Sequence, residues 1–170
     1  MERKRSIALC VEDTEAAQNA AIWAVKGIYR EGDIFHLVYV VKSLKPPMEV
    51  YHGVPGTAYS FSQPGQHKEE AVIAAAKQAI ERRYLPILKT KMVPYELHLY
   101  AERDDATSDR VAEVLLKSIE DRDATLVVIA AHNKPIAHED RFQGNVGSVT
   151  TAIMKRCKRP LAIIHHRGSG

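Results

Sequence analysis

The sequence is poor in cysteine and has little excess of either charge, and both shortages argue against classes of protein. Its two cysteines, Cys10 and Cys157, form no CxxC pair and no His/Cys cluster with metal-ligand spacing. We therefore expect both thiols to be reduced and structural. The net charge is only +3, with 24 basic and 21 acidic residues among 170, so we expect no nucleic acid as a partner.

Histidine is more frequent, but it is not grouped for metal binding. His138 is followed by Glu139 and Asp140, and His165 by His166. Neighbouring residues of a strand point to opposite faces, and a short loop segment has no fixed geometry. We expect these side chains to be solvated, and we predict no metal site.

Long apolar runs are also missing from the start of the chain. The first residues are charged, and the apolar run that follows spans only residues 6–11. Such a run is too short for the core of a signal peptide or for a membrane span. The sequence therefore predicts a cytoplasmic protein without a membrane partner.

Short apolar segments alternate with helical patterns along the chain. Strands are predicted at residues 6–11, 34–41, 95–101, 125–131 and 161–166, and helices at residues 14–31, 68–91, 105–121 and 147–158. This order predicts an α/β fold with a doubly wound, mostly parallel five-stranded sheet and helices on both faces, as in Rossmann-like proteins. The length and the 45% hydrophobic residues suit a single domain over residues 1–170.

Particular residues mark where these elements start and stop. Asp13 or Thr14 is suited to cap the first helix, which should end at Gly32, and Pro86 should kink or break the second. Residues 42–67 are rich in proline and glycine and show no sustained period, so we expect a long flexible loop there. Such a loop is either a disordered connection or a cover over a site.

The common nucleotide-binding and hydrolase motifs are absent. No GxxxxGK[ST] or strand-adjacent GxGxxG occurs, which argues against Walker-type NTPases and dinucleotide oxidoreductases, and the GxSxG elbow of serine hydrolases is missing too. The chain does contain a segment of small residues, from Gly144 to Thr150, that opens the last predicted helix. Exposed amides and the helix dipole suit a phosphate there, although the same pattern also occurs as simple helix capping.

Several segments resemble the universal stress protein family. Residues 7–15 (IALCVEDTE) and 20–25 (AAIWAV) are similar to its opening strand and first helix. Residues 126–133 (LVVIAAHN), 147–150 (GSVT) and 158–164 (KRPLAII) resemble its last two strands and the glycine-serine segment between them. The resemblance extends over nearly the whole chain apart from residues 42–67.

The resemblance implies a site for ATP or AMP, with Mg²⁺ needed only for ATP. By correspondence with the family, the residues that would border the adenosine are Cys10, Glu12, Val41 and Ile129. The residues that would face the phosphates are Gly147, Ser148, Val149 and Thr150. At Gly147 a side chain would crowd the approach of the backbone to a phosphate.

The sequence also departs from the family's nucleotide motif. Ala130 and Asn133 replace its two glycines, Glu12 replaces an aspartate, and residues 134–146 form a longer spacer. Asparagine tolerates a left-handed backbone and alanine adds a single methyl group, so neither replacement forbids a phosphate loop. Ala130 and Asn133 therefore stay among the expected nucleotide contacts.

The chain's last predicted strand starts at Leu161 and ends at His166. The corresponding strand of the family lies at a sheet edge and pairs with its copy, so the resemblance implies a homodimer through this strand. Three functions remain open: a regulatory module that binds an adenine nucleotide, a nucleotide-free dimeric stress or interaction protein, and a weak ATP hydrolase or autophosphorylating enzyme. No catalytic residue is assigned, because Glu12 is only a candidate general base and its distance from a γ-phosphate does not follow from the sequence.

Overall fold

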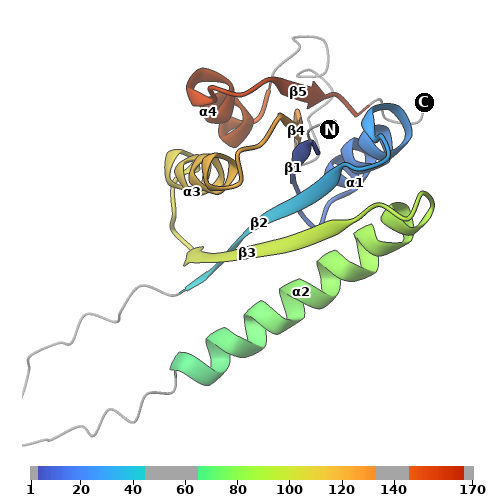
Figure 1. Cartoon of the computed structure of the whole chain (residues 1–170). Helices are drawn as coiled ribbons and strands as arrows, with labels where there is room; N and C mark the ends of the chain where they lie inside the picture. Colours follow the sequence, from blue (N-terminus) through green and yellow to red (C-terminus); the bar gives the residue numbers. More distant parts are fainter. Residues whose placement is uncertain (1–3, 45–64, 133–145, 167–170) are drawn as a thin grey trace, which may run out of the picture.

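Strands and helices alternate along the chain in the computed structural model, which describes residues 4–44, 65–132 and 146–166 (Figure 1). The strands are β1 (Ser6–Cys10), β2 (Ile34–Leu44), β3 (Tyr95–Arg103), β4 (Leu126–Ala130) and β5 (Leu161–Ile164). The helices are α1 (Glu15–Trp23), α2 (Gly65–Lys89), α3 (Ser108–Asp121) and α4 (Ser148–Arg156). A π-helical turn, η1 (Ala24–Ile28), continues α1.

The strands form one parallel sheet in the order β3-β2-β1-β4-β5. In the middle strand, Ala8 is level with His36 of β2 on one side and with Val127 of β4 on the other. From β1 the chain winds outward to β2 and β3, and it then crosses back to build β4 and β5 on the opposite side. The doubly wound α/β fold predicted from the sequence is confirmed, and β3 and β5 are the two edges.

Side chains alternate between the two faces of the sheet, and each face is covered by its own pair of helices. Leu9, Phe35 and Val128 belong to the core that α1 and α2 complete with Ala20 and Tyr84. The opposite face packs against α3 and α4 through Ala8, Val38, Ile129, Leu115 and Ile153. The position of a residue within its strand therefore decides which helices it meets. No helix in the described ranges is long and apolar enough to cross a membrane.

The bounds predicted for the loop, residues 42 and 67, are both wrong. Strand β2 continues to Leu44 because β3 continues beside it to Arg103, and the pair stays in register from Phe35 to Lys42, with an irregularity before Leu44. Helix α2 begins at Gly65, which also lies within the predicted loop. An apolar pattern does not reveal such extensions, because the partner strand provides the hydrogen bonds. Residues 45–64 lie outside the described residues, so the predicted flexibility stays a prediction.

Two predicted helix boundaries also need correction. Thr14 caps α1 as expected, with its side chain accepting a hydrogen bond from the third residue on, but the helix gives way to η1 after Trp23. Gly32, with φ +91°, lies in the turn before β2 and not at the helix end. Helix α2 runs through Pro86 without a break. The proline lies in the last turn, where its missing N–H removes one hydrogen bond, while buried Leu88 keeps the turn on the sheet.

Candidate functional site

The carboxyl ends of β1 and β4 lie side by side in the middle of the sheet, where the direction of winding changes. The segment after β1 leads to α1 on one face, and the segment after β4 leads to α4 on the other. Segments that leave neighbouring strands toward opposite faces open a crevice between them, which is where parallel sheets bind ligands. Four of the predicted site residues lie at this edge: Cys10, Glu12, Ala130 and Gly147.

The start of α4 is anchored to the end of β4 by two short hydrogen bonds to main-chain carbonyls. The Gly147 N–H donates to the Ala131 carbonyl at 2.8 Å, and the buried Thr150 hydroxyl donates to the Ala130 carbonyl at 2.9 Å. A Cβ atom on Gly147 would lie 3.3 Å from the Ala131 oxygen. Close packing of two backbone segments therefore explains this glycine without a phosphate, and the Thr150 hydroxyl is already used within the protein.

Three main-chain amides remain at the first turn of α4. The first hydrogen bond of the helix runs from the Thr151 N–H to the Gly147 carbonyl, at 2.8 Å. The amides of Ser148, Val149 and Thr150 therefore precede the helical ladder, and Gly147 has no side chain to cap them. Together with the helix dipole, these amides make a positive end that is suited to an anion.

A second helix begins beside α4. The Ser148 hydroxyl lies 2.7 Å from the hydroxyl of Ser108, the first residue of α3. Both helices therefore direct the positive ends of their dipoles toward this edge. The nearby Arg110 is engaged by Glu102 at 2.8 Å and by Glu113 at 3.1 Å. Arg110 is therefore neutralised by two carboxylates, whereas the positive ends of the two helices still favour an anion.

The residues predicted to border the adenosine do not share one face of the sheet. Cys10 and Ile129 are buried in the core beneath α3 and α4, on the same face as the start of α4. Val41 lies an even number of residues from Phe35, so it points to the opposite face, toward α1 and α2. Val40 lies with Cys10 and Ile129 and is 9% exposed. Alternation along β2 places Val40 and Val41 on opposite faces, but only the register with β1, in which Cys10 is level with Val38, shows that Val40 is the one beside Cys10.

Cys10 lines this edge as an inert group. Burial raises the pKa of its thiol to about 12, with smaller contributions from Cys157 and from the negative charge of Glu12. The protonated thiol packs as a small apolar side chain and is not a nucleophile. Both cysteines are free thiols, Cys10 buried and Cys157 partly buried.

Glu12 belongs to the segment that connects β1 to α1, and α2 holds this segment in place. The buried Tyr84 hydroxyl donates to the Glu12 carbonyl, and the neighbouring Asp13 pairs with Arg83 at 2.7 Å. Thr14 then caps α1. These contacts fix the path of the backbone and keep the half-buried Glu12 at the carboxyl edge.

Of the two residues that replace the family's glycines, one is described. Ala130 is buried in the core beneath α1 and α2, and its carbonyl accepts the Thr150 hydroxyl. Asn133 and residues 134–145 of the spacer, including His138, lie outside the described residues. The description of the site therefore includes the segments around β1, β4 and the start of α4 but not this spacer.

A hollow of about 480 Å³ lies at the other end of the sheet. Its lining includes Lys4, Arg5, Arg122, Thr125, Arg159 and Pro160. Arg5 is paired with Asp33, and Arg159 with Glu120 at 3.0 Å. These contacts join elements of the fold, and the hollow opens at the amino ends of the strands, away from the start of α4. It does not contribute to the crevice between β1 and β4.

Comparison with known proteins identifies relatives of this chain. The model of the universal stress protein family matches residues 4–165. Among solved structures, universal stress protein UspA from Lactobacillus plantarum aligns with a TM-score of 0.64 at 18% identity, covering 96% of this chain and 99% of that chain. No curated protein sequence matches.

Two further relatives were solved with adenine nucleotides. The universal stress protein from Archaeoglobus fulgidus in complex with dAMP aligns with a TM-score of 0.56 at 16% identity, covering 96% of this chain and 98% of that chain. An Arabidopsis thaliana protein of the same family, with AMP bound, aligns with a TM-score of 0.53 at 11% identity, covering 96% and 93%. At such identities, the likeness to these structures shows a shared fold.

Proposed function

Because the chain belongs to the universal stress protein family, we propose that it is a regulatory module that binds an adenine nucleotide, ATP or AMP, at the start of α4. The observation that carries this proposal is the run of amides at Ser148, Val149 and Thr150, which no described residue caps, beside the carboxyl ends of β1 and β4. The relatives with dAMP and AMP support the choice of nucleotide.

In the proposed complex the phosphates accept hydrogen bonds from these three amides. Thr150 contributes its amide alone, since its hydroxyl donates to the Ala130 carbonyl. The adenosine lies on the face of the sheet that carries Cys10 and Ile129, and Val40 contributes to that surface in place of Val41. Asn133 belongs to the proposed contacts through its place in the sequence.

Glu12 gives the proposed site a dependence on Mg²⁺. Its carboxylate repels a bare triphosphate, and a bound divalent cation offsets that repulsion. AMP carries less charge and needs the cation less. Calorimetric titration with ATP, AMP and GTP, with and without Mg²⁺, should therefore show Mg²⁺ dependence for ATP only. Absence of heat at millimolar ligand, together with no nucleotide copurified on mass spectrometry, would contradict the proposal.

Proline at Ser148 provides the sharpest test of the amides. Gly147 has φ −59° and ψ 156°, which a residue before proline adopts readily, and proline is well tolerated at the first position of a helix. Ser148→Pro should therefore keep α4 and delete one amide donor. We expect binding to weaken by about 1.5–3 kcal/mol, the worth of a hydrogen bond to a charged group. Ser148→Ala keeps the amide and is the matched control.

A nucleotide-free dimer is the second candidate, and the place of β5 at the sheet edge favours it. The Val127 and Ala131 amides donate to the carbonyls of Pro160 and Ile164, so even-numbered residues of this strand face β4. The backbone groups of Leu161 and Ile163 therefore face the open edge. We propose that residues 161–166 pair with their copy there, with or without nucleotide.

Light scattering tests the dimer. Ile163→Pro removes a donor from the open edge and leaves the bonds to β4 intact, so it should give a folded monomer. The matched control, Ala162→Pro, removes a donor that faces β4 and should instead lower the melting temperature. A wild-type monomer at tens of micromolar, on the order of ordinary assay concentrations, would refute the dimer, and so would an Ile163→Pro variant that stays dimeric.

A further inference from the structure

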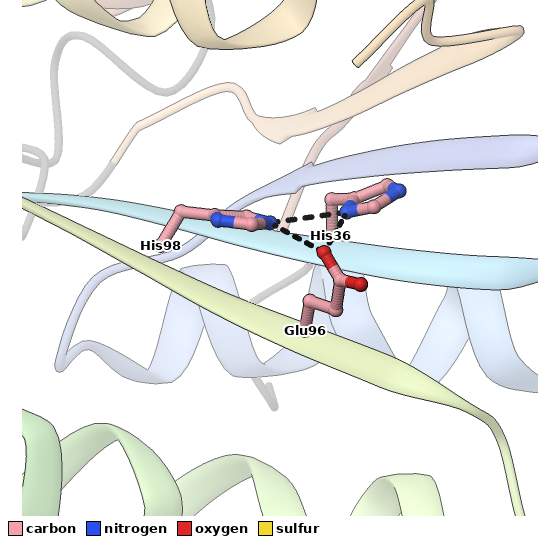
Figure 2. Close-up of side chains that lie close together, drawn as sticks. All are labelled: His36, Glu96 and His98. Carbon is pink, nitrogen blue, oxygen red and sulfur yellow. Dashed lines mark hydrogen bonds and ion pairs between the residues drawn. The ribbon is translucent and has the colours of Figure 1, made fainter.

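Three metal-ligating side chains meet on neighbouring strands at the amino end of the sheet (Figure 2). His36 of β2 is level with Glu96 of β3, and His98 lies two residues further along β3 on the same face. The His36 Nδ1 lies 3.0 Å from the His98 Nε2, and each of these nitrogens lies 3.4 Å from the same Glu96 oxygen, Oε2. His36 lies in β2, whereas Glu96 and His98 lie in β3, after the crossover through α2. No spacing motif in the sequence therefore reveals the cluster.

The two imidazoles of the cluster are largely buried, and the carboxylate beside them is open to solvent. The side chains of His36 and His98 are 9% and 15% exposed, whereas Glu96 is 55% exposed and leaves the cluster open to solvent on one side. Burial, together with the positive charge of Arg122, lowers the pKa of both histidines, although Glu96 partly opposes the shift. Neutral histidine is the form that coordinates a metal ion.

The geometry points to a binding site for a divalent transition-metal ion such as Zn²⁺, with His36, Glu96 and His98 as the three protein ligands. Ligands about 2.0–2.2 Å from a tetrahedral ion lie roughly 3.3 Å from one another, close to the separations in the cluster. Two histidines and one carboxylate are a common ligand set for zinc, and a fourth position then stays open. The ion would join the edge strand β3 to β2, at the opposite end of the sheet from the proposed nucleotide site.

Arg122 competes with the ion for His98. Its Nη2 lies 2.8 Å from the His98 Nδ1, and a guanidinium only donates hydrogen bonds. That nitrogen must therefore be the acceptor, which leaves the His98 proton on Nε2, where it bridges to His36. When the ion binds Nε2, the proton moves to Nδ1 and Arg122 must turn away. The Arg122 Nε has no hydrogen-bond partner among the described residues, so this atom does not oppose the movement.

Substitutions of Glu96 and of Arg122 should shift the affinity for the metal ion in opposite directions. The full chain is titrated with Zn²⁺ in competition with a chromophoric chelator, and Co²⁺ is used to record the absorption of the bound ion. Glu96→Gln removes one ligand and should weaken Zn²⁺ binding at least ~10-fold. Arg122→Gln replaces a positive group that can only donate by a neutral amide whose oxygen can accept the proton on the His98 Nδ1, so it should strengthen binding ~10-fold. The control, His165→Gln with His166→Gln, removes two exposed histidines elsewhere and should leave the affinity unchanged.

Opposite shifts cannot come from misfolding, because loss of structure weakens binding in every variant. Circular dichroism melts of each protein check the fold independently. Lack of Zn²⁺ binding in both the wild type and Arg122→Gln overturns the site. The site is also overturned if Glu96→Gln leaves Zn²⁺ binding unchanged, or if the paired substitutions of His165 and His166 abolish it.

Discussion

The two ends of the parallel sheet present polar groups of different origin. At the carboxyl end many of them belong to the main chain, among them the amides of Ser148, Val149 and Thr150 and the carbonyls of Ala130 and Ala131. Every residue except proline carries an amide, so such a site tolerates replacements in its sequence motif. Under the proposed function, replacement of the family's two glycines by Ala130 and Asn133 would therefore leave the amides at the start of α4 in place.

At the amino end the polar groups are side chains. Arg5 donates to Asp33 at 2.8 Å and to the Ile28 carbonyl at 2.9 Å, and His36, Glu96 and His98 form the cluster beside Arg122. Helices that cover a parallel sheet end here, and the negative ends of their dipoles favour cations. A site made of side chains depends on the identity of each residue. Single substitutions should therefore change the properties of one end of the sheet and leave those of the other end unchanged.

The largest expected effect is at the carboxyl end. Ser148→Asp places a negative charge at the proposed position of the phosphates. Two like charges about 4 Å apart near a protein surface repel each other by on the order of 4 kcal/mol, so nucleotide binding should weaken by more than ~100-fold. The same charge stabilises the helix start by about 0.3–1 kcal/mol. Calorimetry and thermal melts should therefore move in opposite directions. Unchanged binding would remove α4 from the nucleotide site.

The next largest effect concerns the stability of the amino end. The Asp33 side chain is 4% exposed and accepts from Arg5 and from the Arg30 amide. Burial alone raises the pKa of this carboxyl, but these hydrogen bonds and positive charges outweigh it and lower the pKa. Asp33 therefore stabilises the fold above its unfolded pKa of ~3.9, and this contribution is lost as the pH falls through the lower folded value.

Asp33→Asn should thus cost about 2 kcal/mol of unfolding free energy at pH 7. Urea unfolding of both proteins between pH 7 and pH 2 measures the difference, which should shrink as Asp33 of the wild type becomes protonated. Nucleotide binding should be unchanged, because the pair lies at the other end of the sheet. A difference that is independent of pH would show that the carboxylate is not the source of the stability.

The smallest effect distinguishes the two faces of β2. Val40→Ala should weaken nucleotide binding by about 1 kcal/mol, roughly fivefold, through lost apolar contact. Val41→Ala is the matched control, because it is the neighbouring valine, also buried, on the opposite face. Calorimetry well below both melting temperatures should show a loss for Val40→Ala only. Equal losses would mean that the nucleotide does not distinguish the faces.

Most of the fold could be predicted from the sequence, because its signals are local. The apolar runs located all five strands, and of the two residues predicted as possible caps of the first helix, Asp13 and Thr14, the structure selects Thr14. The errors fall where a distant partner decides the outcome. Strand β2 extends past Val41 because β3 pairs with it, and α2 passes through Pro86 because the sheet holds its last turn.

The sequence by itself determined the order of the elements, the α/β fold and the small residues at the start of α4. Periodicity and capping act within a few residues, so one chain is enough to read them. Only the tertiary structure decided that Gly147 packs against Ala131, that Val40 shares a face with Cys10, and that His36 meets Glu96 and His98. These relations depend on strand order and register, which long-range packing sets.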